Sequence, residues 1–178
     1  MGLRRALIAL ALGLVAPAAT GQDAAVRIKA AFLYKFTAYV EWPRAAFPQV
    51  DSPLVIGTLG APELTRELEI ATAGKQVAGR SVQVRRVERV EDAAGCCQML
   101  FLGPEVDAAR ALEVLTRTQL HPVLTVTDAE AAHPNGSVIN FIAADNRIRF
   151  DISRERAERK GLHLSSQLLG VARQVVQR

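Results

Sequence analysis

Cysteine, histidine and aromatic residues are all scarce in this chain. Of its 178 residues, 2 are Cys, 3 are His and 5% are Phe, Trp or Tyr. Structural and catalytic zinc sites take three or four His and Cys ligands at recognisable spacings, which these few residues do not form. A thioredoxin-like redox site needs two residues between its cysteines, whereas Cys96 and Cys97 are adjacent. We therefore expect no bound metal and no cofactor.

Signatures of catalysis and nucleotide binding are missing too. The sequence contains no Gly-x-Gly-x-x-Gly, no Gly-Lys-Ser/Thr loop and no Gly-x-Ser-x-Gly frame. It has no cluster of Ser, His, Asp or Cys of catalytic type. We predict no catalytic residues and a protein that is not an enzyme.

Clustered positive charge is also absent. The chain has 22 Lys and Arg against 18 Asp and Glu, a formal net charge of +4. Basic and acidic residues alternate, as they do from Arg85 to Glu91, whereas a surface that follows phosphates gathers its basic residues into a patch. We expect no nucleic-acid partner.

The one long apolar run lies at the N-terminus. Two arginines precede the run over residues 6–16, small residues follow it, and the chain becomes polar at Gln22. This is the pattern of a secretory signal peptide, and the run is about half of the roughly 20 residues that cross a bilayer. We predict a signal peptide over residues 1–21, cleaved between Ala18 and Gln22, and an exported domain over residues 24–178.

The exported part alternates between helical and strand periodicity. Residues 24–41 predict an amphipathic helix with an aromatic face, which ends at Trp42 because a residue before proline avoids the α region. The elements predicted next are a strand (54–59), a helix (63–71), a strand (81–87), a strand (99–102), a helix (106–116) and a strand (123–127). This order favours a single α/β domain, in which helices flank a mostly parallel mixed sheet.

The last third of the chain changes character. Residues 137–143 and 147–152 predict a late β-hairpin, since the Asp and Asn between them tolerate the left-handed region. Residues 154–160 predict a short helix that stops at Gly161. Ser165 and Ser166 are suited to cap a final helix that continues through Val175 and Val176.

The chain resembles the YfiR family of exported bacterial proteins. The stretches that carry the resemblance are KAAFLYKFTAYVEWP, LVIGTLG, CQMLFLG, GSVINFIAADNRIRFDIS and AERKGLHLSSQLLGVAR, between about Lys29 and Arg173. The resemblance implies a periplasmic α/β domain that binds the periplasmic domain of a membrane-bound diguanylate cyclase or sensor kinase. It implies a regulatory protein that represses its partner and touches no cyclic di-GMP itself.

The adjacent cysteines allow more than one interpretation. The family commonly has Cys-His where this chain has Cys97 and Gln98, and Cys96 is an addition. Neighbouring Cα atoms are about 3.8 Å apart, while ordinary disulfides span about 4.4–6.8 Å, so a bond between them would be strained. We favour Cys97 as a small buried residue and Cys96 as a partly exposed neighbour. The alternative is an intermolecular disulfide through Cys96 or Cys97, to a partner or in a homodimer.

Two functions and one docking surface remain as hypotheses. The first function is docking on the partner through the late hairpin and C-terminal helices, with Ile139, Phe141, Asp151 and Val175 as partner-binding residues. This region has more apolar residues than we expect it to bury, and exposed apolar patches mark interfaces. The alternative for these residues is that Ile139 and Phe141 are core and that Asp151 pairs with a nearby Arg. The second function is binding or conversion of a small molecule at the carboxyl edge of the sheet.

Overall fold

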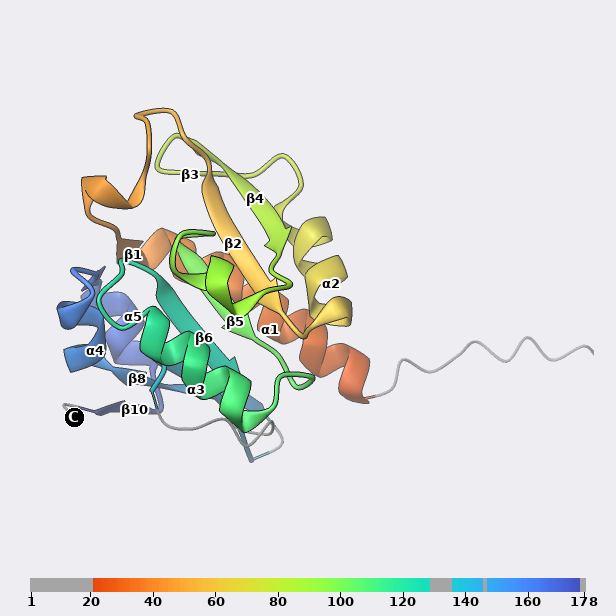
Figure 1. Ribbon diagram of the computed structural model, residues 1–178. Coiled ribbons are helices and arrows are strands. Elements are labelled where there is room, and N and C mark those ends of the chain that lie inside the picture. Colours follow the sequence, from red (N-terminus) through yellow and green to blue (C-terminus); the bar gives the residue numbers. More distant parts are fainter. Residues whose placement is uncertain (1–20, 129–135, 146, 177–178) are drawn as a thin grey trace, which may run out of the picture.

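The computed structural model describes residues 21–128, 136–145 and 147–176, so the predicted signal peptide lies outside the described residues except for Gly21. Within these ranges, no helix has the length and apolar character needed to cross a membrane. Figure 1 shows the arrangement of the elements. In chain order they are α1 (Gly21–Tyr39), β1 (Val40–Glu41), η1 (Arg44–Ala46), β2 (Leu54–Leu59), α2 (Pro62–Thr72), β3 (Gln76–Val77), β4 (Arg80–Arg86), η2 (Val90–Ala94), β5 (Met99–Leu102), α3 (Ala108–Arg117), β6 (Leu124–Asp128), β7 (Ile139–Ala144), β8 (Arg147–Ser153), α4 (Arg154–Arg159), β9 (His163–Leu164), α5 (Ser166–Val171) and β10 (Gln174–Val176).

The main sheet has the strand order β10-β8-β7-β6-β5-β2-β4-β3. Strands β4, β2, β5, β6 and β7 are parallel to one another, and β7 and β8 form an antiparallel hairpin. The chain enters at β2, moves outward to β4 and then returns to the other side of β2 at β5. This reversal places the topological switch point of the sheet between β2 and β5. The predicted α/β fold with a mostly parallel mixed sheet is confirmed.

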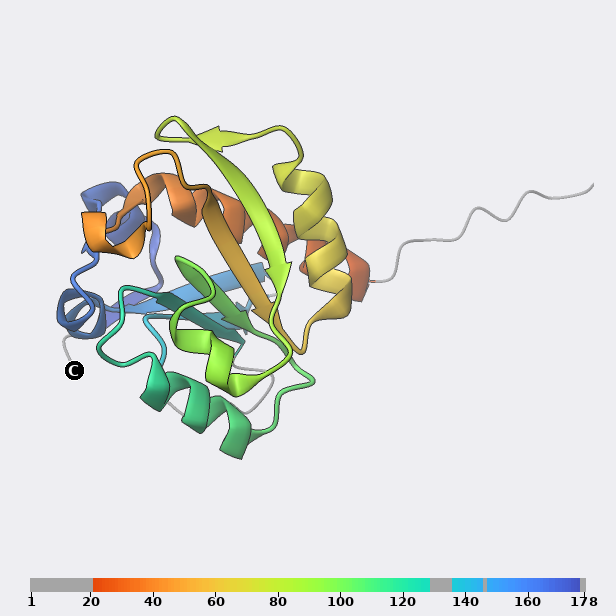
Figure 2. The ribbon, with the colours of Figure 1, turned by 45° about the horizontal axis from the view of Figure 1, so that its top comes forward.

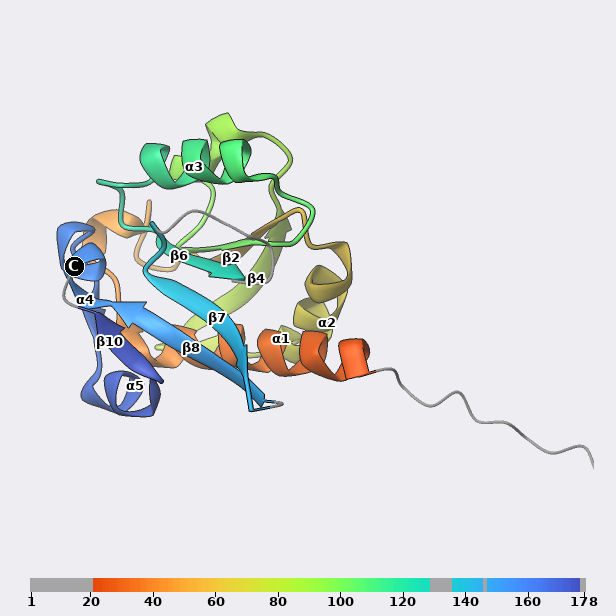
Figure 3. The same cartoon turned by 90° about the horizontal axis from the view of Figure 1, so that it is seen from below.

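Helices cover both faces of the sheet. Figure 3 shows α1 and α2 on one face and α3 on the other, and the turned view in Figure 2 shows η2 beside α3. The strands alternate between two hydrophobic clusters: Leu54 and Ile56 face the α1 side, while Val55 and Leu59 face the α3 side. Because both faces are covered, β2 is buried along its whole length.

The aromatic face of α1 packs against the late hairpin. Phe36 stacks on Phe141 with ring centroids 5.9 Å apart and meets Phe150 edge-on at 4.9 Å. Phe32 contacts the same two rings. Helix α1 ends at Tyr39, and the next two residues pair with β9 as the short strand β1. The predicted helix and its aromatic face are confirmed, with its C-terminal end two residues earlier.

The C-terminal segment differs from the prediction of a long final helix. Helix α5 stops at Val171, and Ala172 takes extended dihedral angles of −64° and 145°. The backbone N–H of Arg173 then donates to the carbonyl of Phe150 at 2.8 Å, and β10 pairs in parallel with β8. Val175 therefore lies in a strand, where β-branched residues fit well once a neighbouring strand offers its hydrogen bonds.

Candidate docking surface and other sites

The sheet edge formed by β8 and β10 carries an ion pair. Asp151 lies in β8 and Arg173 immediately precedes β10, and Nε of Arg173 donates to Oδ1 of Asp151 at 2.8 Å. The hydrogen bond and the negative charge of Asp151 raise the pKa of Arg173. Since the arginine side chain is 44% exposed and that of Asp151 only 18%, the pair stands at the surface and fastens the start of β10 to β8.

Strand β10 ends the sheet as the structure describes it. Val175 lies opposite Ile152 of β8 in the parallel register, and its exposed fraction is 36%. A cavity of about 260 Å³ beside this strand is lined by Gly136, Ser137, Val138, Asn140, Asp151, Ile152, Ser153, Arg156 and Val176. An edge strand with an exposed valine and an adjacent cavity is a surface on which another polypeptide can dock.

The four predicted partner-binding residues separate into two groups. Ile139 and Phe141 are fully buried in β7, beneath the aromatic face of α1. Asp151 and Val175 are the two that reach the surface. Asp151 follows the predicted alternation, pointing away from its buried neighbours Phe150 and Ile152. Ile139 also pairs with Ile152, so the buried residues support the strands that present the exposed ones.

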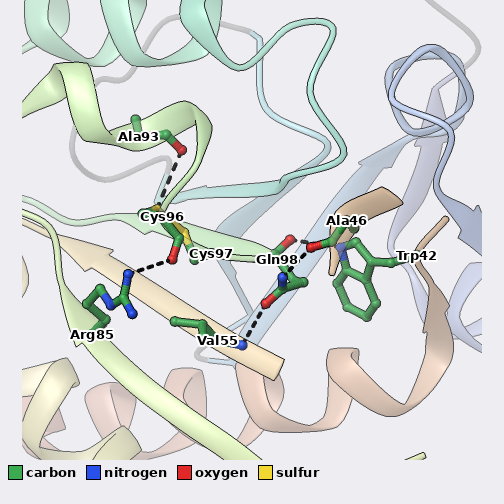
Figure 4. The surroundings of a disulfide bond; sticks show 8 residues. All are labelled: Trp42, Ala46, Val55, Arg85, Ala93, Cys96, Cys97 and Gln98. Atoms are coloured by element: carbon green, nitrogen blue, oxygen red, sulfur yellow. Dashed lines mark hydrogen bonds between the residues drawn. A yellow bond between two sulfur atoms is a disulfide. The ribbon is translucent and has the colours of Figure 1, made fainter. Parts of the chain in front are cut away.

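Cys96 and Cys97 form a disulfide bond with each other (Figure 4). Cys97 is buried, as predicted, at 7% exposure. The expectation of a partly exposed Cys96 is wrong, since it is buried at 9% exposure, because η2 and α3 fold over this end of β5. An intermolecular disulfide through either sulfur remains a prediction, and it would require this bond to open.

Gln98 ties three segments together beside the disulfide, which the sequence alone did not reveal. Its side-chain Oε1 accepts from the N–H of Val55 at 2.8 Å, and its Nε2 donates to the carbonyl of Ala46 at 2.6 Å. Its own carbonyl accepts from Nε1 of Trp42 at 2.8 Å. Figure 4 shows that these bonds come from opposite sides of the residue, so Gln98 holds β2, β5 and the segment before β2 in place.

A second candidate site lies at the carboxyl edge of the sheet. Lys29 of α1 and Asp128 at the end of β6 form a buried ion pair with 2.5 Å between Nζ and Oδ2. Both line a cavity of about 680 Å³, together with Ala25, Val26, Ala61, Pro62, Glu63, Leu64, Phe101, Pro104 and Glu105, among others. The cavity opens beside the switch point between β2 and β5, where open α/β sheets place their ligands.

Metal ligands do not gather in the part of the chain that the structure describes. No group of three or more His, Cys, Asp and Glu side chains there could hold a metal ion. The fold and its surfaces thus define an α/β domain with two candidate sites for contact or binding.

The chain belongs to the YfiR/HmsC-like family. The family model matches residues 26–173, nearly all of the predicted exported domain. This confirms the resemblance seen in the sequence motifs. A comparison with curated proteins finds no match. Members of this family are periplasmic regulators of cyclic di-GMP signalling, and they act by regulation rather than by catalysis.

Proposed function

We propose that this protein is exported to the periplasm and represses an inner-membrane diguanylate cyclase, or a related sensor kinase, by docking on its periplasmic domain. The family match over residues 26–173 is the observation that carries this proposal. Cyclic di-GMP is made in the cytoplasm, so the protein would change the conformation of the partner from across the membrane. No catalytic step is assigned to the protein itself.

The sheet edge formed by β8 and β10 is the docking surface in this proposal. It offers a charged contact at the Asp151–Arg173 pair and an apolar one at Val175, which lies opposite Ile152 and therefore points to the other side of the sheet from Asp151. Interfaces commonly take most of their binding energy from a few such residues. Ile139 and Phe141 would contribute from the core by holding the strands in register.

Pull-down of tagged inner-membrane diguanylate cyclases with variants of this protein tests the surface. Val175→Asp should abolish capture, because it sets a charge in the apolar contact. Val50→Asp is the matched control, since Val50 is an exposed valine before β2, outside the late hairpin and the C-terminal segment. If Val175→Asp folds normally and captures the partner as well as Val50→Asp does, the docking surface lies elsewhere.

The Asp151–Arg173 pair allows a sharper comparison. Both Asp151→Ala and Arg173→Ala break the ion pair, but Arg173→Ala leaves the carboxylate free to meet the partner. If the carboxylate itself contacts the partner, capture is lost only with Asp151→Ala. If the pair merely fastens β10, both variants lose capture to a similar extent.

The cavity at the carboxyl edge favours a second candidate function, which is binding of a small molecule. Native mass spectrometry of protein released from the periplasm tests it. Ala25→Phe should fill the cavity and remove any bound mass, whereas Ala24→Phe, whose residue does not line the cavity, should not. A wild-type protein that carries no bound mass would count against this function.

A further inference from the structure

A basic cavity lies between α3 and α4, on the side of the molecule that adjoins the proposed docking surface. Its volume is about 240 Å³, and it is lined by Leu112, Leu115, Thr116, Gln119, Gly136, Arg156, Arg159 and Lys160. Gly136 and Arg156 also line the cavity beside β10, so the two hollows are neighbours. Three of the lining residues are cationic and none is acidic.

Lys160 is buried, and no carboxylate among the described residues pairs with it. The residue is 6% exposed, and its Nζ donates to the backbone carbonyl of Thr118 at the C-terminus of α3. No ion pair joins Lys160 or Arg156 to an acidic residue within the described ranges. Burial lowers the pKa of Lys160 to about 8, so the ammonium is still charged at neutral pH. A buried charge without a counterion is costly, and an added carboxylate would offset that cost.

The acidic residues on the neighbouring helices are already engaged. Glu155 binds Arg159, and Glu113 binds Arg117 one turn away on α3. Neither of these two carboxylates is therefore available to Lys160 or Arg156. The Lys160 ammonium has three N–H donors. One of them binds the carbonyl of Thr118, which leaves the other two for a ligand.

One exposed apolar side chain lines the cavity, and another follows a lining residue in the sequence. Leu112, which lines the cavity, is 54% exposed, and Leu120, which follows the lining residue Gln119, is 78% exposed. An inorganic anion would make no use of these side chains. A cavity of this size is also smaller than the pockets of about 300–1,000 Å³ that hold drug-sized ligands, and it suits a single side chain.

We propose that this cavity receives a carboxylate side chain, Asp or Glu, from an acidic and apolar segment of the protein partner, with its apolar neighbour resting on Leu112. The inference rests on the proposed docking function and extends that surface past Arg156 onto α3 and α4. The carboxylate would accept hydrogen bonds from Lys160 and Arg156, and such charge-assisted bonds are the strong ones in interfaces.

Peptide titration of the ¹⁵N-labelled exported domain at pH 6.5, followed by NMR, tests this proposal. The probes are acetyl-Leu-Glu-Leu-Glu-Leu-amide and the same peptide with Gln in place of Glu. The acidic peptide should shift the amide signals of Gln119, Gly136 and Lys160, and the Gln peptide should bind at least about ten-fold more weakly, equivalent to about 1.4 kcal/mol. Equal binding of the two peptides, or no shift at these signals, would overturn the proposal.

Variants and competing ligands complete the test. Lys160→Gln keeps an N–H donor for Thr118 but removes the charge, and Arg156→Gln removes the other unpaired cation. Each substitution should weaken binding of the acidic peptide about ten-fold. Arg154→Gln is the matched control, because Arg154 lies on α4, pairs with Glu158 and does not line the cavity. If Arg154→Gln weakens binding as much as the other two, the site is not this cavity.

Other occupants give distinct results that contradict the proposal. Sodium phosphate that shifts the same signals at lower concentration than the peptide would show a site for small anions. Shifts caused by phosphatidylglycerol vesicles, or by raising the protein concentration alone, would show a lipid contact or a second copy. The titration contains no cyclase, so it can fail while repression in cells succeeds, and the reverse.

Discussion

Lys29 and Asp128 form an ion pair in the interior of the protein, although they are 99 positions apart in the sequence. Nζ of Lys29 lies 2.5 Å from Oδ2 of Asp128, and the two side chains are 9% and 7% exposed. The pair joins the first helix to the carboxyl end of β6, in the wall of the cavity beside the switch point. Its two charges offset each other in a buried site.

Removing one member of this pair should destabilise the protein strongly. Lys29→Met removes the cation that Lys29 places on the buried Asp128 carboxylate, for which we expect a loss of about 3–5 kcal/mol in the free energy of unfolding. Urea denaturation measures it. Arg89→Met is the control, because the Arg89–Asp92 pair is exposed and should contribute less than about 1 kcal/mol. Similar losses in the two variants would mean that the Lys29–Asp128 pair is not buried in solution.

Because of Lys160, the free energy of unfolding should change with pH in the alkaline range. Burial lowers its pKa from 10.5 to about 8, so between these values the unfolded chain holds a proton that the native protein has lost. The free energy of unfolding should therefore rise between pH 8 and 10.5, while below pH 8 the cost of burying the charge is fully present. At about 1.4 kcal/mol per pKa unit, this cost is roughly 3 kcal/mol.

Lys160→Met checks this by removing the titrating group. The variant should lose that rise and should be more stable than the native protein at pH 7, by less than the full cost, since the bond to Thr118 is lost too. Urea denaturation of both proteins from pH 7 to 10.5 is the measurement, and parallel pH profiles would show that Lys160 is not buried.

Gly57 gives a test of the position of Cys97. A Cβ atom at residue 57 would lie 2.6 Å from Sγ of Cys97 and 3.1 Å from Cδ1 of Leu100. Gly57→Ala should therefore destabilise the protein by about 1–3 kcal/mol through overpacking. Gly170→Ala is the control, because an added Cβ there meets nothing within 4 Å and favours helix α5 by about 0.5–1 kcal/mol.

A double variant separates the clash with sulfur from other effects. Removing Sγ with Cys97→Ala should make Gly57→Ala less costly than it is in the native background, because contacting residues are not additive. Thermal unfolding of the four proteins in the cycle gives the coupling. Strict additivity would place the sulfur away from Gly57.

The cysteine pair predicts a simple result for thiol chemistry. Protein denatured without reductant should contain no thiol that reacts with iodoacetamide, and it should run as a monomer on a non-reducing gel. Cys96→Ser should change the free energy of unfolding by less than about 1 kcal/mol, since a bond between neighbours closes a very small loop. A reducible dimer that disappears with Cys96→Ser would instead establish the intermolecular disulfide.

Local sequence signals predicted most of the central fold. Strands β2 and β5 begin and end at the predicted residues, because each is a short apolar run between breakers. The hairpin of β7 and β8 formed as expected, with Asp145 at a φ of 52°. The segment from Gln174 was wrongly predicted as helix, because its strand forms only through pairing with β8, a partner that local periodicity cannot reveal.

The candidate sites were less predictable for the same reason. Alternation placed Asp151 at the surface, and the sequence allowed a nearby arginine as its partner. Nothing local identified Arg173 as that arginine, or Asp128 as the partner of Lys29. The burial of Lys160 likewise results from the packing of α3 against the segment after α4, which joins residues 42 positions apart.

The concentration of cyclic di-GMP in living cells tests the proposed repression most directly. Mass spectrometry would measure it in a strain that lacks this protein, in a strain that again produces the full-length protein, and in a strain that produces the protein without residues 1–21. If the protein represses its partner from the periplasm, the level of cyclic di-GMP rises in the deletion strain, the full-length protein returns it to the original level, and the form without residues 1–21 does not. An unchanged level in the deletion strain, or full repression by a form confined to the cytoplasm, would contradict repression from the periplasm.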